Sequence, residues 1–122
     1  MQVINLHQKF SLFTDQWSPK IIGQVSGHDI KLAKIAGDFV WHDHAQEDEL
    51  FYVLSGTLYI DFRDQPTAEL QAGEMIIVPA GVEHRPRTKD GMEVQLMLVE
   101  PGKIKHTGDV VHELTKEQYE HI

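Results

Sequence analysis

Two histidines separated by one residue, His42 and His44, are the first side chains in this sequence with the spacing of a metal site. On a β-strand, residues two apart project from the same face, so both imidazoles can reach one point. Imidazole is a common ligand of divalent iron, nickel, copper and zinc. A His-x-His pair on a strand is also frequent on solvated surfaces, so further ligands are needed before the pair indicates a metal.

A carboxylate follows the histidine pair closely. Glu47, Asp48 and Glu49 form an acidic run, and spacing alone does not choose between them. Alternation favours Glu49, because Phe51 and Val53 share its face, as expected for an acid at the mouth of an apolar pocket. The alternative is that the run is hydrated surface at a bend.

A third histidine, His84, comes after the turn Pro79-Ala80-Gly81. The preceding run, Met75–Val78, is apolar on both faces, which predicts a deeply buried strand. The Pro-x-Gly turn predicts that the next strand returns antiparallel to it, with His84 near the start of an inner strand. With the histidine pair and Glu49, it completes a set of three imidazoles and one carboxylate.

β-Strand periodicity runs through most of the chain, and turn residues recur between the short apolar runs. Glu49–Leu54 and Thr57–Phe62 flank Ser55-Gly56 and predict a hairpin. Further strands are predicted at Ile21–Val25, Ile30–Ala36, Phe39–His44, Glu74–Val78, Val82–Arg87 and Glu93–Val99. This number of short strands predicts an all-β fold, a jelly roll or barrel, because open sheet edges invite aggregation.

Two segments depart from the strand pattern. Ser11–Pro19 is predicted to be an irregular lead-in anchored by Trp17. Thr115–Gln118 fits a capping box and predicts one short C-terminal helix.

Composition restricts the class of protein. The 122 residues carry 11 Lys and Arg against 19 Asp and Glu, a formal net charge of −8, and contain no cysteine. This length fits one domain spanning residues 1–122, and any metal must be held by histidine and carboxylate. The negative charge argues against nucleic acid as a partner. Because no apolar run has membrane-spanning length and the start lacks a signal pattern, we expect a cytoplasmic protein without membrane contact.

The chemistry-bearing residues resemble the two motifs of the cupin superfamily, in the form of a small single-domain bacterial cupin. Motif one, residues 37–56, is represented by Gly37, His42, His44, Glu49 and Gly56. Motif two, residues 73–88, is represented by Gly73, Pro79-Ala80-Gly81 and His84. The resemblance implies a double-stranded β-helix, a jelly-roll barrel, with one divalent metal ion held by His42, His44, Glu49 and His84.

Two positions depart from the family pattern. Four residues separate Gly37 from His42, where the family usually has five, and Thr88 stands where the family has asparagine. Neither position is a metal ligand in the family, so the implied site is unaffected, while the local strand geometry is less closely defined.

Three neutral imidazoles and one carboxylate around a divalent ion carry a net charge of +1, which favours an anionic or chelating oxygen ligand. The donor set leaves the metal open among Fe, Mn, Ni, Zn and Cu. The resemblance implies a metal-dependent enzyme of oxygenase or isomerase type acting on a small oxygenated molecule. The alternatives are a non-catalytic sensor whose metal anchors an anionic ligand, and an ion that only stabilises the barrel. No catalytic residue is assigned, and no Lys or Arg is plainly aimed inward.

Alternation supplies candidates for the pocket wall, for which plain core packing is the alternative. These candidates are Phe51, Val53, Leu58 and Ile60. On the strand Glu93–Val99, either Val94, Leu96 and Leu98 or the opposite set with Gln95 and Met97 faces inward. Gln95 or Met97 could then orient a substrate at the metal.

Apolar side chains on the second face of the strands predict a partner. The residues that place apolar groups on this second face are Leu50, Tyr52, Leu54, Ile76 and Val78. Bulky apolar residues facing outward on a small barrel are usually covered by another chain or by the N-terminal arm. We therefore expect a homodimer. Arg85 and Arg87 are predicted to face away from His84.

Overall fold

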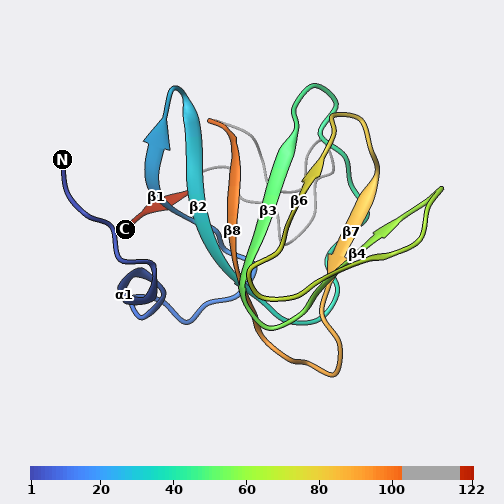
Figure 1. The fold of residues 1–122 in the computed structure, drawn as a ribbon, viewed down its shortest axis with the longest axis horizontal. Helices are drawn as coiled ribbons and strands as arrows, with labels where there is room; N and C mark the ends of the chain where they lie inside the picture. The colour runs from blue at the N-terminus through green and yellow to red at the C-terminus, as the bar shows by residue number, and fades with distance from the viewer. Residues whose placement is uncertain (103–118) are drawn as a thin grey trace.

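The computed structural model describes residues 1–102 and 119–122, which form two β-sheets and one short helix (Figure 1). Within these residues the larger sheet has six strands in the order β6-β3-β8-β2-β1-β9, and the smaller sheet has three in the order β5-β4-β7. The strands are β1 (Lys20–Val25), β2 (His28–Ile35), β3 (Glu49–Ser55), β4 (Leu58–Phe62), β5 (Ala68–Leu70), β6 (Met75–Val78), β7 (His84–Arg87), β8 (Val94–Pro101) and β9 (Glu120–His121). The predicted all-β jelly-roll class is confirmed. The predicted helix at Thr115–Gln118 lies outside the described residues.

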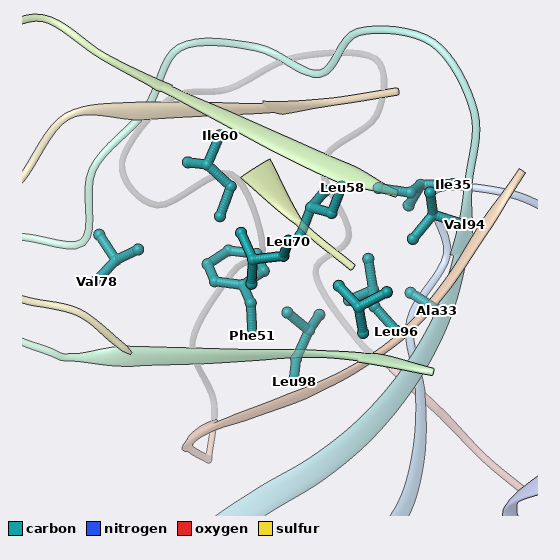
Figure 2. Packing of buried hydrophobic residues seen from close by; sticks show 11 residues of the cluster. Ala33, Ile35, Phe51, Leu58, Ile60, Leu70, Val78, Val94, Leu96 and Leu98 are labelled. Carbon is teal, nitrogen blue, oxygen red and sulfur yellow. The ribbon is translucent and has the colours of Figure 1, made fainter. Parts of the chain in front are cut away.

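The two sheets enclose the main hydrophobic core. Strand β8 alternates along its whole length, so that Val94, Leu96 and Leu98 point inward and the residues between them do not. Figure 2 shows these side chains meeting Phe51 and the residues of the smaller sheet between the two layers. The buried members of this cluster are Ala33, Ile35, Phe51, Val53, Leu58, Ile60, Leu70, Val78, Val94, Leu96 and Leu98.

The predicted hairpin after Glu49–Leu54 is wrong, although both of its strands exist. Strand β3 pairs with β6 and β8 in the larger sheet, whereas β4 pairs with β5 and β7 in the smaller one. Gly56 lies between them with φ of +87°, and a Cβ there would stand 2.8 Å from the carbonyl oxygen of Glu93. The sequence pattern indicated the turn but not the sheet that the second strand joins.

The predicted antiparallel return after Pro79-Ala80-Gly81 is wrong for the same reason, since β7 pairs with β4 and not with β6. Strand β6 is also not buried on both faces. Met75 and Ile77 are 54% and 53% exposed, whereas Val78 is buried. Strand β6 is an edge strand of the larger sheet, and its outer face remains open.

The segment predicted as the strand Phe39–His44 is an irregular stretch held against β7. Isolated bridges join Asp38 to Arg87 and His42 to His84. The backbone N–H of His42 donates to the carbonyl of His84 at 3.0 Å, and the return bond measures 2.8 Å. These bonds fix the first histidine pair beside the third histidine.

The N-terminal arm begins with helix α1 (Leu6–Phe10), whose cap residue Asn5 accepts a hydrogen bond from the backbone N–H of Gln8 at 2.9 Å. Phe10 and Phe13 then pack on Leu32, on the outer side of β2. Figure 1 shows α1 beside β1 and β2, away from the smaller sheet. Of the helices in the described part of the chain, none has the length and apolar character needed to cross a membrane.

The irregular lead-in before β1 is confirmed, with Trp17 as its anchor. The indole Nε1–H of Trp17 donates to the carbonyl of Ala36 at 3.0 Å, and its backbone N–H donates to the carbonyl of Lys34 at 2.9 Å. The ring stacks on Phe39 at 4.7 Å between centroids, with 7° between the ring planes. The arm is therefore fixed to the barrel beside the segment that carries the first histidines.

Candidate metal centre

The structure brings His42, His44, Glu49 and His84 together inside the barrel. One ligand atom from each of the four lies within 4.8 Å of the others, and all four side chains are buried. Glu49 begins β3 in the larger sheet, His84 begins β7 in the smaller sheet, and the two remaining histidines come from the connecting segment. The cluster therefore joins both sheets.

Hydrogen bonds set the tautomer of two of the imidazoles. Nδ1 of His42 lies 2.9 Å from the carbonyl of Val40, and Nδ1 of His84 lies 2.8 Å from the carbonyl of Val82. A carbonyl oxygen only accepts, so each Nδ1 carries the proton and each Nε2 keeps its lone pair. This second bond of a ligand histidine is the arrangement that orients imidazoles toward a metal.

Three polar atoms of the cluster are buried without a hydrogen-bond partner. They are Nε2 of His44, Nε2 of His84 and Oε1 of Glu49. Each of the two nitrogens lies 3.4 Å from the Glu49 oxygen. Burying such groups without a partner costs about 1–3 kcal/mol each, so their convergence on one point indicates a missing common partner.

The charge states suit a cation. Burial, with the neighbouring His84 adding to it, lowers the pKa of His42 to about 4, so this imidazole is neutral near pH 7. Burial alone would raise the pKa of the Glu49 carboxyl, but His44 and His84 outweigh that effect and hold the pKa below its ordinary range. A neutral imidazole beside an ionised carboxylate is the state that binds a metal.

The separations within the cluster also suit a single ion. Atoms that share one ion through bonds of about 2.0–2.2 Å lie no more than about 4.4 Å apart. The two 3.4 Å separations fall inside this range, and the limit of 4.8 Å for the whole set requires only a small contraction. The residues present therefore fit a divalent metal.

The acidic residues of the run Glu47–Glu49 have different contacts. The carboxylate of Asp48 accepts a hydrogen bond from the backbone N–H of Ala80 at 2.9 Å and so holds the turn before β7. The carbonyl of His44 accepts from the N–H of Gly81 at 2.8 Å in the same turn. Of the three acids, Glu49 is the one that lies in the cluster.

A partly open cavity of about 40 Å³ adjoins the cluster and shows which wall candidates face it. Of the predicted set, Phe51 lines this cavity. Val53, Leu58 and Ile60 instead belong to the packed core. The residues lining the cavity are Trp17, Pro19, Ala33, Ile35, Phe39, His42, Glu49, Phe51, Pro86, Leu96 and Leu98.

Gln95 and Met97 do not face the cavity, so their suggested role in orienting a substrate is wrong. On β8, the side chains that point into the barrel and line the cavity are those of Leu96 and Leu98. Met97 packs instead against the cluster around Phe10 on the outer side of the sheet.

A buried ion pair beside Glu49 was missed by sequence reasoning. Nζ of Lys31 lies 2.7 Å from Oε1 of Glu100, and the two side chains are 0% and 1% exposed. Burial, with the nearby Glu49 carboxylate adding to it, raises the pKa of Glu100 well above its ordinary value, while Lys31 opposes the shift. Contrary to expectation, a lysine does point inward, but Glu100 neutralises it.

The remaining cations lie elsewhere. Arg85 and Arg87 face away from His84, as predicted, and both donate to Oδ2 of Asp61 on the smaller sheet, at 2.8 Å in each case. Trp41 packs under the guanidinium of Arg63, whose Cζ lies 3.7 Å from the indole ring centre. These side chains do not line the cavity.

Comparisons with known proteins agree with the fold described above. The Cupin_2 family model, a cupin domain, matches residues 30–100. A crystal structure of a cupin-2 domain protein from Shewanella frigidimarina NCIMB 400 is 52% identical with a TM-score of 0.78, covering 81% of this chain and 94% of that one. The structure of NMB1881 from Neisseria meningitidis is 34% identical with a TM-score of 0.74, covering 83% and 100%.

Two curated relatives match over shorter lengths. YdbB of Bacillus subtilis, an uncharacterised protein, is 45% identical over 67 residues, which cover 55% of this chain and 59% of that protein. An acireductone dioxygenase of Yarrowia lipolytica is 33% identical over 73 residues, which cover 56% and 39%. The chain thus matches only part of the length of these relatives. Because the family model covers more than half of the chain, the protein belongs to the cupin family.

Proposed function

We propose that this cupin holds one divalent metal ion between His42, His44, Glu49 and His84. The observation that carries the proposal is the set of three buried donor atoms that converge without hydrogen-bond partners. When bound, the ion would act as a Lewis acid for an oxygen ligand, because four protein ligands leave two positions open on an octahedral ion. Fe, Mn, Ni, Zn and Cu all suit this donor set.

We further propose that the centre is catalytic, of oxygenase or isomerase type, and acts on a small oxygenated molecule. The cavity beside His42 and Glu49 supports this, since it leaves space for such a molecule next to two of the four residues that would hold the ion. The partial similarity to an acireductone dioxygenase favours the oxygenase type. The alternative is a sensor, in which the ion anchors a ligand without turnover.

The metal is tested by elemental analysis of protein purified without chelators, followed by calorimetric titration of the stripped protein with Fe(II), Mn(II), Ni(II) and Zn(II). We expect one ion per chain and a loss of affinity of at least about 100-fold in His84→Ala. Lys89→Ala is the matched surface control. Wild-type protein that binds no metal in either experiment would refute the centre.

Catalysis is tested after anaerobic loading with Fe(II). Oxygen uptake is followed over catechols, diketones and thiols, and product analysis under nitrogen detects isomerisation. Turnover that disappears in Glu49→Gln supports the enzyme. Saturable binding without turnover for every compound supports the sensor.

We also retain the homodimer as a proposal. The predicted outward residues of β6, Ile76 and Val78, face the core instead. Met75 and Ile77 on this edge strand are more than half exposed and would be covered by a second copy. Light scattering after size-exclusion chromatography should give twice 14.0 kDa. A single mass of one chain would reject the dimer.

A further inference from the structure

The cavity next to the metal cluster is apolar almost everywhere. Of the eleven residues that line it, His42 and Glu49 are polar, and both belong to the proposed metal centre. The other nine are aliphatic, aromatic or proline side chains. A volume of about 40 Å³ accommodates about three water-sized groups. The space therefore holds only the donor end of a small ligand, whose two donor atoms would occupy the two positions that four protein ligands leave open, and the rest of the ligand extends along the apolar wall.

No cation in the described residues is placed to neutralise an anionic ligand in this cavity. Lys31 is bound to Glu100, Lys20 to Asp15, and Lys34 to the carbonyl of Phe13. Arg63 pairs with Glu83, next to the smaller sheet, and both Arg85 and Arg87 pair with Asp61 on β4. A phosphate needs several charge-assisted hydrogen bonds from lysine, arginine or backbone N–H groups, and the lining offers none of these side chains.

Trp17 supplies one wall of the cavity from outside the barrel. Its backbone adopts φ of +57°, a left-handed conformation that is unusual for tryptophan, and two hydrogen bonds hold it there. Its ring stacks on Phe39, which in turn meets His42 edge to face at 5.4 Å between centroids. Trp17 is partly exposed and Phe39 is buried, and both side chains line the cavity.

We propose that the centre takes a small molecule with an apolar body, a pair of oxygen donors and no phosphate, and that Trp17 is the residue that selects it. The donors would face the ion and the apolar body would lie against the indole ring of Trp17. This inference rests on the proposed metal centre. It excludes sugar phosphates and small polycarboxylates as the preferred ligands.

The test uses the Trp41→Phe variant, in which Trp17 is the single tryptophan of the chain. The protein is loaded with Ni(II) and titrated with acetylacetone, an apolar diketone, and separately with 3-phosphoglycerate and oxalate. We expect acetylacetone to change Trp17 fluorescence and to bind at least about tenfold more tightly than either anion. Equal or tighter binding of 3-phosphoglycerate or oxalate would overturn the proposal.

The role of Trp17 is tested by Trp17→Ala, Trp17→Leu and Trp17→Phe, with calorimetry as the readout. Trp17→Ala should weaken acetylacetone about tenfold and leave the Ni(II) affinity within about twofold, whereas Trp17→Phe restores most of the binding. Thermal melts show whether each variant folds, and Trp17→Leu replaces Trp17→Ala if the latter does not. Unchanged acetylacetone affinity in a folded variant refutes the selecting role, whereas wild-type protein that binds no Ni(II) refutes the metal centre instead.

Discussion

Gly37 and Thr88, 51 positions apart, are joined by two hydrogen bonds. The N–H of Gly37 donates to Oγ1 of Thr88 at 2.7 Å, and the N–H of Thr88 donates to the carbonyl of Gly37 at 2.9 Å. These are the two positions at which the chain departs from the cupin motif pattern. The departures therefore meet in one contact, at the start of the segment that leads to the metal cluster.

This contact predicts a specific cost for Thr88→Val. The buried Thr88 would lose its hydroxyl and leave the N–H of Gly37 without a partner, so we expect a loss of about 1–2 kcal/mol in the free energy of unfolding. Thr88→Ser keeps the hydroxyl and should lose less. Urea denaturation measures both variants, and equal stability of Val and Ser at this position would contradict the role of the hydroxyl.

The buried pair of Lys31 and Glu100 predicts a strongly non-additive double-mutant cycle. Lys31→Met leaves Glu100 buried beside Glu49 without a counter-charge, and it should cost about 3–5 kcal/mol. Adding Glu100→Gln removes the unpaired charge and should recover more than half of that loss. The exposed pair of Arg63 and Glu83 is the control, because Arg63→Met should cost no more than about 1 kcal/mol. Additive losses at Lys31 and Glu100 would show that the pair is not coupled.

Metal binding predicts a stability gain that depends on Glu49. A hundredfold excess of free metal over its dissociation constant adds about 2.7 kcal/mol, a rise of roughly 10 °C in melting temperature for a chain of this size. Glu49→Gln should abolish most of this rise, whereas Glu47→Gln, in the same acidic run, should retain it. If the rise were lost in Glu47→Gln and kept in Glu49→Gln, Glu47 and not Glu49 would be the ligand.

Asp61 predicts a loss of stability in acid. The hydrogen bond from Arg87, with Thr67 and Arg85 adding to it, lowers the pKa of Asp61 below its ordinary value of 3.8. Its stabilising effect is therefore complete above about pH 4 and is lost as the pH falls through the lowered pKa. Asp61→Asn should be less stable at pH 7 by about 1–2 kcal/mol.

The pH profile separates this effect from a simple packing defect. In melts between about pH 2 and pH 7, the stability difference between wild type and Asp61→Asn should shrink as the pH falls. Asp64→Asn, at an exposed position, is the control and should follow the wild-type curve. A difference that stays constant across this range would argue against the ion pairs of Asp61.

The corner at Gly56 predicts a larger cost for alanine than an ordinary turn glycine. Gly56→Ala combines a positive φ with a Cβ only 2.8 Å from the Glu93 carbonyl oxygen, and it should cost about 3 kcal/mol or more. Gly73 has a similar φ of +89° but no atom within 4 Å of a Cβ, so Gly73→Ala should cost about 1–2 kcal/mol. Denaturant titration of both variants measures the difference. If Gly56→Ala and Gly73→Ala lost the same free energy of unfolding, the short distance to the Glu93 carbonyl would not be the cause of the loss.

Most of the strands could be predicted from the sequence because alternation is a local pattern, whereas the set of four candidate ligands came from the resemblance to the two cupin motifs, since spacing alone left the acid open. Alternation along β3 and β8 fixes which side chains share a face, and the two motifs fix the order of the histidines. The partner of each strand depends on long-range pairing, so neither the passage from β3 to β4 nor that from β6 to β7 was predicted. For the same reason, the sequence did not predict that β6 is an edge strand with an exposed outer face.

The inward lysine was missed for a different reason. Leu32 is buried on the outer side of β2 by the N-terminal arm, so β2 carries no simple division into an apolar inner and a polar outer face. A buried acid could have been expected from the alternation along β8, because Glu100 lies on the same inward face as Leu96 and Leu98. The predicted strand ended at Val99 and stopped one residue before it.

Because the candidate ligands come from both sheets, an ion at this centre would also be a removable cross-link. Glu49 and His84 enclose a long loop of chain, and tying its ends together restricts the unfolded state as a disulfide does. A protein without cysteine could gain this restraint from dissolved metal alone. The resistance of the protein to proteolysis would then increase with the concentration of that metal.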